Sequence, residues 1–290
     1  GTLTLPQSCD GNTPVVLMVT GSGQQNRDEE CFDHKPFAVI ADALARQGIA
    51  SLRYDDRGYN DPSVTFTDFT TDDFKDDAAA GIAFLRNRFK TVGVLGHSEG
   101  GTIAMMLAGE GKPDFIVSMA GMAVSGKETL LSQNRTALRS MGLSDDAVND
   151  YCKVISDIFD KVAAGMNIDE VLQGYDDSSS LKPLISQAKQ TLSVPFMRHF
   201  ITIDVRKSLP EIKCPVLAVN GKLDTQVDCT ANLGALENGL VNARHETVAF
   251  DSLNHLFQHC TTGSVVEYQQ IEETMSNDVL EKITSWIKSL

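Results

Sequence analysis

The chain has 290 residues, and its 25 Lys and Arg against 39 Asp and Glu give a formal net charge of −14. Apolar residues make up 42% of it, which is ordinary globular usage and excludes a disordered, collagen-like or coiled-coil chain. An acidic surface repels phosphate groups, so we expect no nucleic-acid partner. No apolar run is long enough to span a bilayer, so we expect a soluble protein without a membrane span.

The six cysteines are too few and too scattered for a disulfide scaffold, and none lies in a zinc-binding pattern, so no metal is expected. Buried or free thiols are the favoured interpretation. One or two bridges in an exported protein are the alternative, with Cys229 and Cys260 as candidate neighbours. No signal peptide is visible after Gly1, which leaves a cytoplasmic and an exported location both open.

Strand-like apolar runs alternate with helix-like periodicity along the chain. Strands are predicted at residues 15–20, 49–54, 91–95, 115–119, 215–219 and 246–250. Helices with an apolar face are predicted at residues 37–44, 74–89 and 279–290, and a small-residue helix is predicted at 98–108. This alternation predicts an α/β fold with a mostly parallel, doubly wound sheet covered by helices on both faces.

One stretch, residues 122–207, is polar, rich in helix formers and without a convincing strand. Within it, residues 145–163 and 181–192 are predicted helices, and residues 174–180 are a predicted loop. We therefore predict a helical cap at 122–207, inserted into a core that is formed by residues 1–121 and 208–290. The alternative is a peripheral helical layer with no role at a functional site.

The sharpest motif is Gly96-His-Ser-Glu-Gly100, which matches G-x-S-x-G and stands between a β-rich run and a small-residue helix. In such a turn the serine occupies strained backbone, and side chains two residues before or after it would collide with neighbouring backbone. Gly96 and Gly100 meet that requirement and leave the Ser98 hydroxyl exposed at the end of a strand. Ser98 is the predicted nucleophile, and the following helix N-terminus favours negative charge beside it. A glycine-rich turn with a surface serine is the alternative.

A serine nucleophile needs a base, and the base needs a carboxylate that orients it. Asp224 follows a predicted strand and a glycine turn and is the predicted acid, while Asp228 is the runner-up because it could equally cap the next helix. His255 lies just past the following strand and is the predicted base. The five other histidines occupy weaker positions: His34, His97 (in the turn itself), His199, His245 and His259.

A tetrahedral intermediate needs backbone N–H donors around its oxyanion. The N–H of Glu99, directly after the nucleophile, is the first predicted donor. The loop Thr20-Gly-Ser-Gly23 follows the first buried strand, and the N–H of Ser22 is the second predicted donor, with Gly23 as the near alternative. This loop lacks the third glycine and the immediate helix of a dinucleotide site, so no cofactor is predicted.

Together these residues resemble the α/β-hydrolase superfamily, and within it bacterial esterases that are grouped with serine-aminopeptidase-like and dienelactone-hydrolase-like proteins. The resemblance supports the predicted triad. It also suggests that Arg27, Asp28 and Arg57 lie close to the site, where we favour a structural role, an Arg–Asp pair that ties down the oxyanion loop. The segments that carry the resemblance are residues 20–29, 34–37, 53–58, 96–101, the Asp224 loop and residues 253–258.

Two features depart from the pattern of these relatives. After Gly58 the chain continues Tyr-Asn-Asp61, where relatives commonly have x-Gly-x-Ser, which predicts a loop of different shape. The family's sheet normally begins with an antiparallel hairpin, but here only Thr2–Leu5 precedes Pro6. We therefore expect one strand of that hairpin and the absence of an upstream segment from this chain.

The leading hypothesis is a serine carboxylesterase that cleaves small or medium acyl esters through an acyl-enzyme, with a small-molecule ester as its partner and without a metal or cofactor. A serine peptidase or aminopeptidase of the same fold is the first alternative, and it would need an acidic or carbonyl-lined pocket for a peptide amino terminus. A non-catalytic binding protein on this fold is the second. The sequence defines neither the acyl length nor the oligomeric state.

Overall fold

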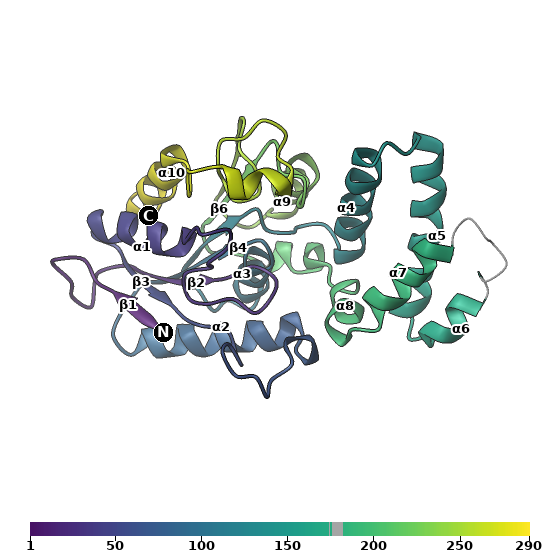
Figure 1. Cartoon of the computed structure of the whole chain (residues 1–290). Coiled ribbons are helices and arrows are strands. Elements are labelled where there is room, and N and C mark those ends of the chain that lie inside the picture. The colour runs from purple at the N-terminus through teal and green to yellow at the C-terminus, as the bar shows by residue number, and fades with distance from the viewer. Residues whose placement is uncertain (174, 176–181) are drawn as a thin grey trace.

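One mixed sheet organises the chain, whose computed structural model describes residues 1–173, 175 and 182–290. In these residues the strands lie in the order β1-β3-β2-β4-β5-β6-β7, all parallel except β1, which runs antiparallel to β3 at one edge (Figure 1). The predicted mostly parallel sheet is confirmed. Both ends of each of the six predicted strands lie within two residues of the observed bounds. The strands are β1 (Thr2–Thr4), β2 (Val15–Val19), β3 (Ala50–Arg53), β4 (Val92–His97), β5 (Phe115–Met119), β6 (Val216–Gly221) and β7 (His245–Phe250).

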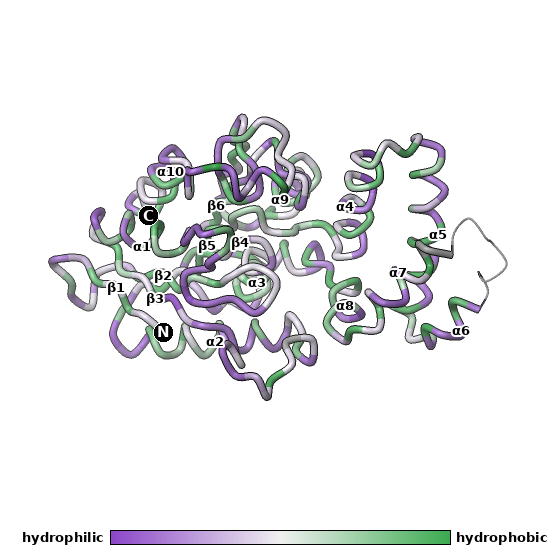
Figure 2. The backbone as a smooth tube through the Cα atoms, viewed as in Figure 1, coloured by the Kyte–Doolittle hydropathy of each residue, from purple (hydrophilic) through white to green (hydrophobic). Residues whose placement is uncertain are grey.

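Helices cover both faces of this sheet because the buried strands are apolar on both sides (Figures 1 and 2). On β2, Val16 and Met18 pack with α1 and α10, whereas Leu17 and Val19 pack with α2 and α3 on the other face. The predicted doubly wound architecture is therefore confirmed. The covering helices are α1 (Pro36–Arg46), α2 (Thr71–Arg86), α3 (Glu99–Gly109), α9 (Cys229–Gly239) and α10 (Asn277–Lys288), and short 3-10 turns are η1 (Phe66–Asp68), η2 (Val205–Lys207), η3 (Leu209–Glu211) and η4 (Val265–Gln270).

Among the described residues, five α-helices lie between β5 and β6 and project to one side of the sheet (Figure 1). Helices α4 to α7 share a hydrophobic cluster of their own, in which Ile155 and Phe159 of α5 pack with Leu192 of α7, whereas the buried aromatic residues of α8 pack in the core cluster. Helices α5 and α7 match the two predicted here to within one residue, and α4, α6 and α8 were not predicted. The predicted loop at 174–180 lies outside the described residues except for Tyr175. The helices are α4 (Gly126–Ser140), α5 (Asp145–Ala163), α6 (Ile168–Gln173), α7 (Lys182–Leu192) and α8 (Pro195–Phe200).

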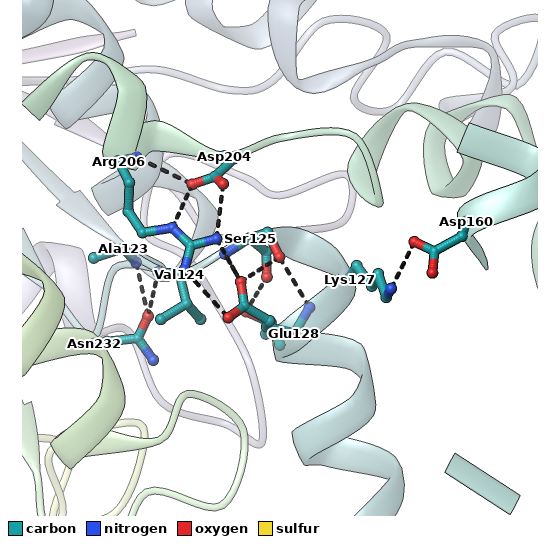
Figure 3. Close-up of polar contacts among 10 residues, drawn as sticks. Ala123, Val124, Ser125, Lys127, Glu128, Asp160, Asp204, Arg206 and Asn232 are labelled. Carbon is teal, nitrogen blue, oxygen red and sulfur yellow. Dashed lines mark hydrogen bonds and ion pairs between the residues drawn. The ribbon is translucent and has the colours of Figure 1, made fainter. Parts of the chain in front are cut away.

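Polar contacts tie together the two segments that connect these helices to the sheet (Figure 3). Arg206 of η2 donates hydrogen bonds to Glu128 of α4 at 2.6 Å and to Asp204 at 2.7 Å. Asn232 of α9 is buried, and its Oδ1 accepts the backbone N–H groups of residues 123–124 at 2.7 and 3.1 Å. A buried amide oxygen that accepts two successive backbone N–H groups fixes the path of the chain as it leaves β5.

All six cysteines are free in this structure. Burial raises the pKa of the Cys31, Cys214 and Cys229 thiols to about 11, so these groups are protonated at neutral pH and are weak nucleophiles. Among the described residues, no helix combines the length and the apolar character needed to cross a membrane.

Candidate active site

Ser98 stands on the tight turn between β4 and α3, with φ 53° and ψ −117°. Its backbone N–H donates to the carbonyl of Met119 at 2.8 Å, which anchors the turn to the neighbouring strand. A Cβ at position 96 would lie 1.9 Å from the Gly100 oxygen, and a Cβ at position 100 would lie 2.0 Å from the Val19 oxygen. Only glycine fits at these two positions, which is the steric reason for the G-x-S-x-G spacing.

Asp224 and His255 form a buried pair on the loops that follow β6 and β7. Asp224 Oδ2 accepts a hydrogen bond from His255 Nδ1 at 2.7 Å, and its Oδ1 accepts the backbone N–H groups of residues 226–227 at 2.8 Å each. A proton held on Nδ1 leaves the Nε2 lone pair of His255 free to accept another proton. Asp228, the runner-up acid, instead caps α9 through a backbone N–H at 2.7 Å.

Ser98 and His255 line one cavity of about 400 Å³, which lies between the carboxyl ends of the strands and the helices α4 and α8. This volume is within the range of small-molecule sites. The wall is mainly apolar, and α4 and α8 contribute part of it. Its apolar and aromatic side chains are Phe32, Met122, Leu130, Phe196, Met197, Phe200, Val227, Leu256, Val265 and Tyr268.

The predicted oxyanion donors differ in their surroundings. Ser22 lines the cavity, whereas Gly23 borders a separate small void that it shares with Glu99. The N–H of Gly21 is already bound to Glu29 Oε1 at 2.6 Å. Within the part of the chain that the structure describes, the N–H groups of Ser22 and Glu99 donate to no protein acceptor. This arrangement favours Ser22 over Gly23 as the second donor.

Two buried carboxyls lie behind the Ser22 loop. Glu99 is buried and accepts a hydrogen bond from the Thr71 hydroxyl at 2.6 Å. Burial raises the pKa of Glu99, although hydrogen bonds from Thr71 and Ser22 oppose the shift. Burial likewise raises the pKa of Asp56 to about 7, opposed by its hydrogen bonds. Burial therefore disfavours a full negative charge on Glu99 beside the oxyanion donors.

Asp56→Asn is expected to flatten the dependence of stability on pH. The raised pKa of Asp56 means that the folded state retains a proton that the unfolded state has lost, so stability falls as pH rises from about 4 to about 7. In the parent, the Gln25 N–H donates to Asp56 Oδ2 at 2.8 Å. An Asn side chain can still accept this hydrogen bond, and its amide group can donate to the Thr20 hydroxyl. At about pH 8 the variant should exceed the parent in unfolding free energy by up to about 4 kcal/mol. Urea unfolding of both proteins at about pH 5 and pH 8 measures this, and an equal slope for the two would contradict it.

The described lining of the cavity does not include Arg27, Asp28 or Arg57. Arg27 and Asp28, on the segment after β2, instead bind opposite charges on or just after β3. Arg57, after β3, binds two carboxylates of α2. The pairs are Arg27–Asp55 at 2.5 Å, Asp28–Arg53, and Arg57 with Asp73 and Asp77 at 3.0 and 2.6 Å.

Two further residues, Glu29 and His97, were not selected from the sequence as site residues. Glu29 Oε1 accepts from His97 Nδ1 at 3.0 Å, and His97 Nε2 lies 3.0 Å from the carbonyl oxygen of His255. Both residues fall inside segments that carry the family resemblance, but no local pattern connects two residues 68 positions apart. The remaining histidines contact polar partners outside the cavity: His34 with Thr274, His199 with Asp72, His245 with Glu237 and His259 with Glu273.

In the described part of the chain, no group of three His, Cys, Asp or Glu side chains could hold a metal ion. The site itself presents a serine, a histidine–carboxylate pair and backbone N–H groups.

Comparisons with known proteins point to one family. Residues 34–259 match the family model described as serine aminopeptidase, S33. Esterase EstD of Thermotoga maritima is 32% identical over 99% of this chain, and serine hydrolase BPHL of Mus musculus is 26% identical over 75% of it. The matches cover 65% of each relative, so the chain spans about two thirds of their length. The solved structure of Est1E from Butyrivibrio proteoclasticus is 13% identical, covers 99% of this chain and 92% of its own, and superposes with a TM-score of 0.57, which shows the shared fold.

Proposed function

The chain belongs to the serine aminopeptidase (S33) family of α/β-hydrolases, and on this premise we propose that it hydrolyses small or medium carboxylic esters through an acyl-enzyme. One observation carries the proposal: Ser98 and His255 line the same cavity, and Asp224 holds His255 at 2.7 Å. The esterase relative from Thermotoga maritima supports the choice of an ester as the substrate class.

The proposed reaction has two halves, acylation of Ser98 and hydrolysis of the acyl-enzyme, and the same groups act in both. His255 Nε2 takes the Ser98 proton while Oγ attacks the ester carbonyl, and the N–H groups of Ser22 and Glu99 stabilise the oxyanion. The protonated His255 then gives this proton to the departing alcohol, which leaves Ser98 acylated. Water attacks the acyl-enzyme by the same route, the acid departs, and the hydroxyl of Ser98 is restored. Asp224 stabilises the imidazolium in both halves.

The lining of the cavity favours an acyl group over a charged peptide terminus. An aminopeptidase must neutralise the ammonium group of its substrate, which requires a free carboxylate or several carbonyl oxygens at the site. Glu29 is the only acidic side chain among the described lining residues, and its Oε1 already accepts hydrogen bonds from Gly21 and His97. The apolar wall instead suits a short aliphatic or aromatic acyl chain.

We assign residues 122–207 the role of a cap over this site, inserted into a core of residues 1–121 and 208–290. Leu130 and Gln133 of α4 and Phe196 and Phe200 of α8 supply part of the cavity wall. Gln133 also donates to the carbonyl of Gln226 at 3.0 Å, beside the Asp224 loop. In this assignment, the cap determines which acyl groups fit.

A substrate panel tests the proposal. p-Nitrophenyl acetate, butyrate and octanoate are compared with aminoacyl p-nitroanilides, with kcat/KM measured for each. We expect the best ester to exceed the best anilide by more than about 100-fold, because Glu29, the only acidic side chain of the described lining, is already paired with His97. Higher turnover of an anilide would establish the aminopeptidase instead. Failure of a fluorophosphonate probe to label Ser98 would favour a non-catalytic binding protein.

A further inference from the structure

We propose that Glu29 and His97 are positioning residues, a buried carboxylate–imidazolium pair that holds His255 and the Ser22 loop in place on either side of Ser98. The inference rests on the proposed ester hydrolysis, because it concerns the geometry of that reaction. Neither residue transfers a proton or forms a bond to the substrate in it.

The hydrogen bonds of His97 are all satisfied when both of its ring nitrogens carry protons. Nδ1 faces Glu29 Oε1 at 3.0 Å, and Nε2 faces the carbonyl oxygen of His255 at 3.0 Å. A carbonyl oxygen can only accept, and Glu29 Oε1 also accepts the Gly21 N–H at 2.6 Å. A neutral imidazole has only one N–H, so it would leave one of its nitrogens against an acceptor. The geometry therefore fits an imidazolium, with the Glu29 carboxylate as its counter-charge.

Charge and burial are consistent with this assignment. The side chains of His97 and Glu29 are 8% and 5% exposed, so the pair is shielded from water. Burial by itself lowers the pKa of His97, but the Glu29 charge, their hydrogen bond, the bond to the His255 carbonyl and the charge of Asp224 shift it upward overall. The facing groups are thus Glu29 before α1, Asp224 after β6 and His255 after β7.

The pair connects three segments that must be aligned for catalysis. Glu29 Oε1 engages Gly21, which directly precedes the proposed oxyanion donor Ser22. His97 directly precedes Ser98, and its Nε2 holds the backbone of the proposed base, whose ring centroid lies 4.7 Å from the His97 ring. A misplacement of about 1 Å in such a constellation can cost about 100-fold in rate.

A spectroscopic experiment tests the charge without relying on activity. In protein labelled with ¹⁵N-histidine at about pH 8, we expect one histidine with two protonated ring nitrogens, and its signals should disappear in His97→Gln. Glu29→Gln keeps an oxygen acceptor at this position but removes the counter-charge, so the same histidine should become neutral at about pH 8. A neutral His97 in the parent protein would overturn the proposal, whether or not the chain hydrolyses esters.

Kinetics test the positioning role. Glu29→Gln and His97→Gln should each lower kcat for the best ester about 10- to 100-fold and change KM by less than about 3-fold, since the apolar cavity wall is retained. For Glu29→Gln, kcat should also fall with rising pH through a new ionisation, that of the unpaired His97. The kcat of the double variant should equal that of the less active single variant, because the two residues act as a unit.

A matched control lies on the same loop. His259 donates to Glu273 at 2.9 Å in an exposed pair four residues beyond His255, so His259→Gln removes a similar contact outside the cavity. We expect its kcat and KM to remain within about 2-fold of the parent values. Unchanged kcat in both Glu29→Gln and His97→Gln would overturn the positioning role, and absence of ester turnover in the parent would instead overturn the proposed function.

Discussion

Ser98→Ala is expected to lower kcat for ester hydrolysis by about 10⁴- to 10⁶-fold. The proposed mechanism requires the Oγ atom to form the acyl-enzyme, and no other nucleophile replaces it, because burial raises the pKa of the cavity thiol of Cys31 to about 11. Active-site titration with a fluorophosphonate and steady-state rates on the best p-nitrophenyl ester measure the loss. Labelling or turnover within about 10-fold of the parent would exclude Ser98 as the nucleophile.

The strained backbone at Ser98 allows a second, independent test, in which stability is measured as well as activity. Ser98 has φ 53°, a region that costs a non-glycine residue of the order of 1 kcal/mol or more. Ser98→Gly should therefore be inactive yet at least as stable as the parent in urea unfolding. Ser252 provides the control, because it is an exposed serine with φ 58° on the loop after β7. Ser252→Gly should be stabilised to a similar extent and remain fully active.

Asp224→Asn is expected to lower kcat by about 10⁴-fold with little loss of stability. Oδ1 of Asp224 accepts two backbone N–H groups at 2.8 Å, so an Asn side chain would keep its oxygen there and turn its NH₂ toward His255 Nδ1. His255 must then accept at Nδ1 and carry its proton on Nε2, where it cannot receive the proton of Ser98. The pH dependence of kcat/KM and circular dichroism of the folded variant check this expectation.

Asp228→Asn is the matched control for that experiment. Asp228 is four residues away and caps α9 through a backbone N–H at 2.7 Å, a role that Asn fills equally well. We expect its kcat to stay within about 2-fold of the parent value. A loss at Asp228 comparable to that at Asp224 would mean that the acid of the site has been assigned to the wrong residue.

Local patterns in the sequence were sufficient for the architecture of the core. Alternating apolar runs define buried strands, and spacings of three and four define helix faces, so the six parallel strands and helices α1, α2, α3 and α10 could be predicted, whereas no range was predicted for α9. The insertion was harder. Helix α4 buries few large apolar residues, and α8 has only six residues, so hydrophobic periodicity does not reveal them. A capping box at Ser125 and Glu128 was the available signal for α4.

The choice of candidate site residues followed from chemistry that is also local. A G-x-S-x-G turn requires its glycines because Cβ atoms at positions 96 and 100 would meet backbone oxygens at about 2 Å. The ends of parallel strands collect at one edge of the sheet, so an acid after one strand and a histidine after the next could be chosen as partners for Ser98. The roles of these residues stay predictions that the variants above test.

Only the tertiary structure decided what surrounds those residues. The pairing of Glu29 with His97, the separate charge pairs of Arg27 and Arg57, and the closure of the cavity by α4 and α8 all join segments far apart in the chain. Hydropathy periodicity records which face of an element is buried, but not which distant side chain meets it there. The sequence by itself therefore determined the sheet and the candidate nucleophile, whereas the partners of buried charges and the shape of the cavity depended on how the loops and the insertion pack.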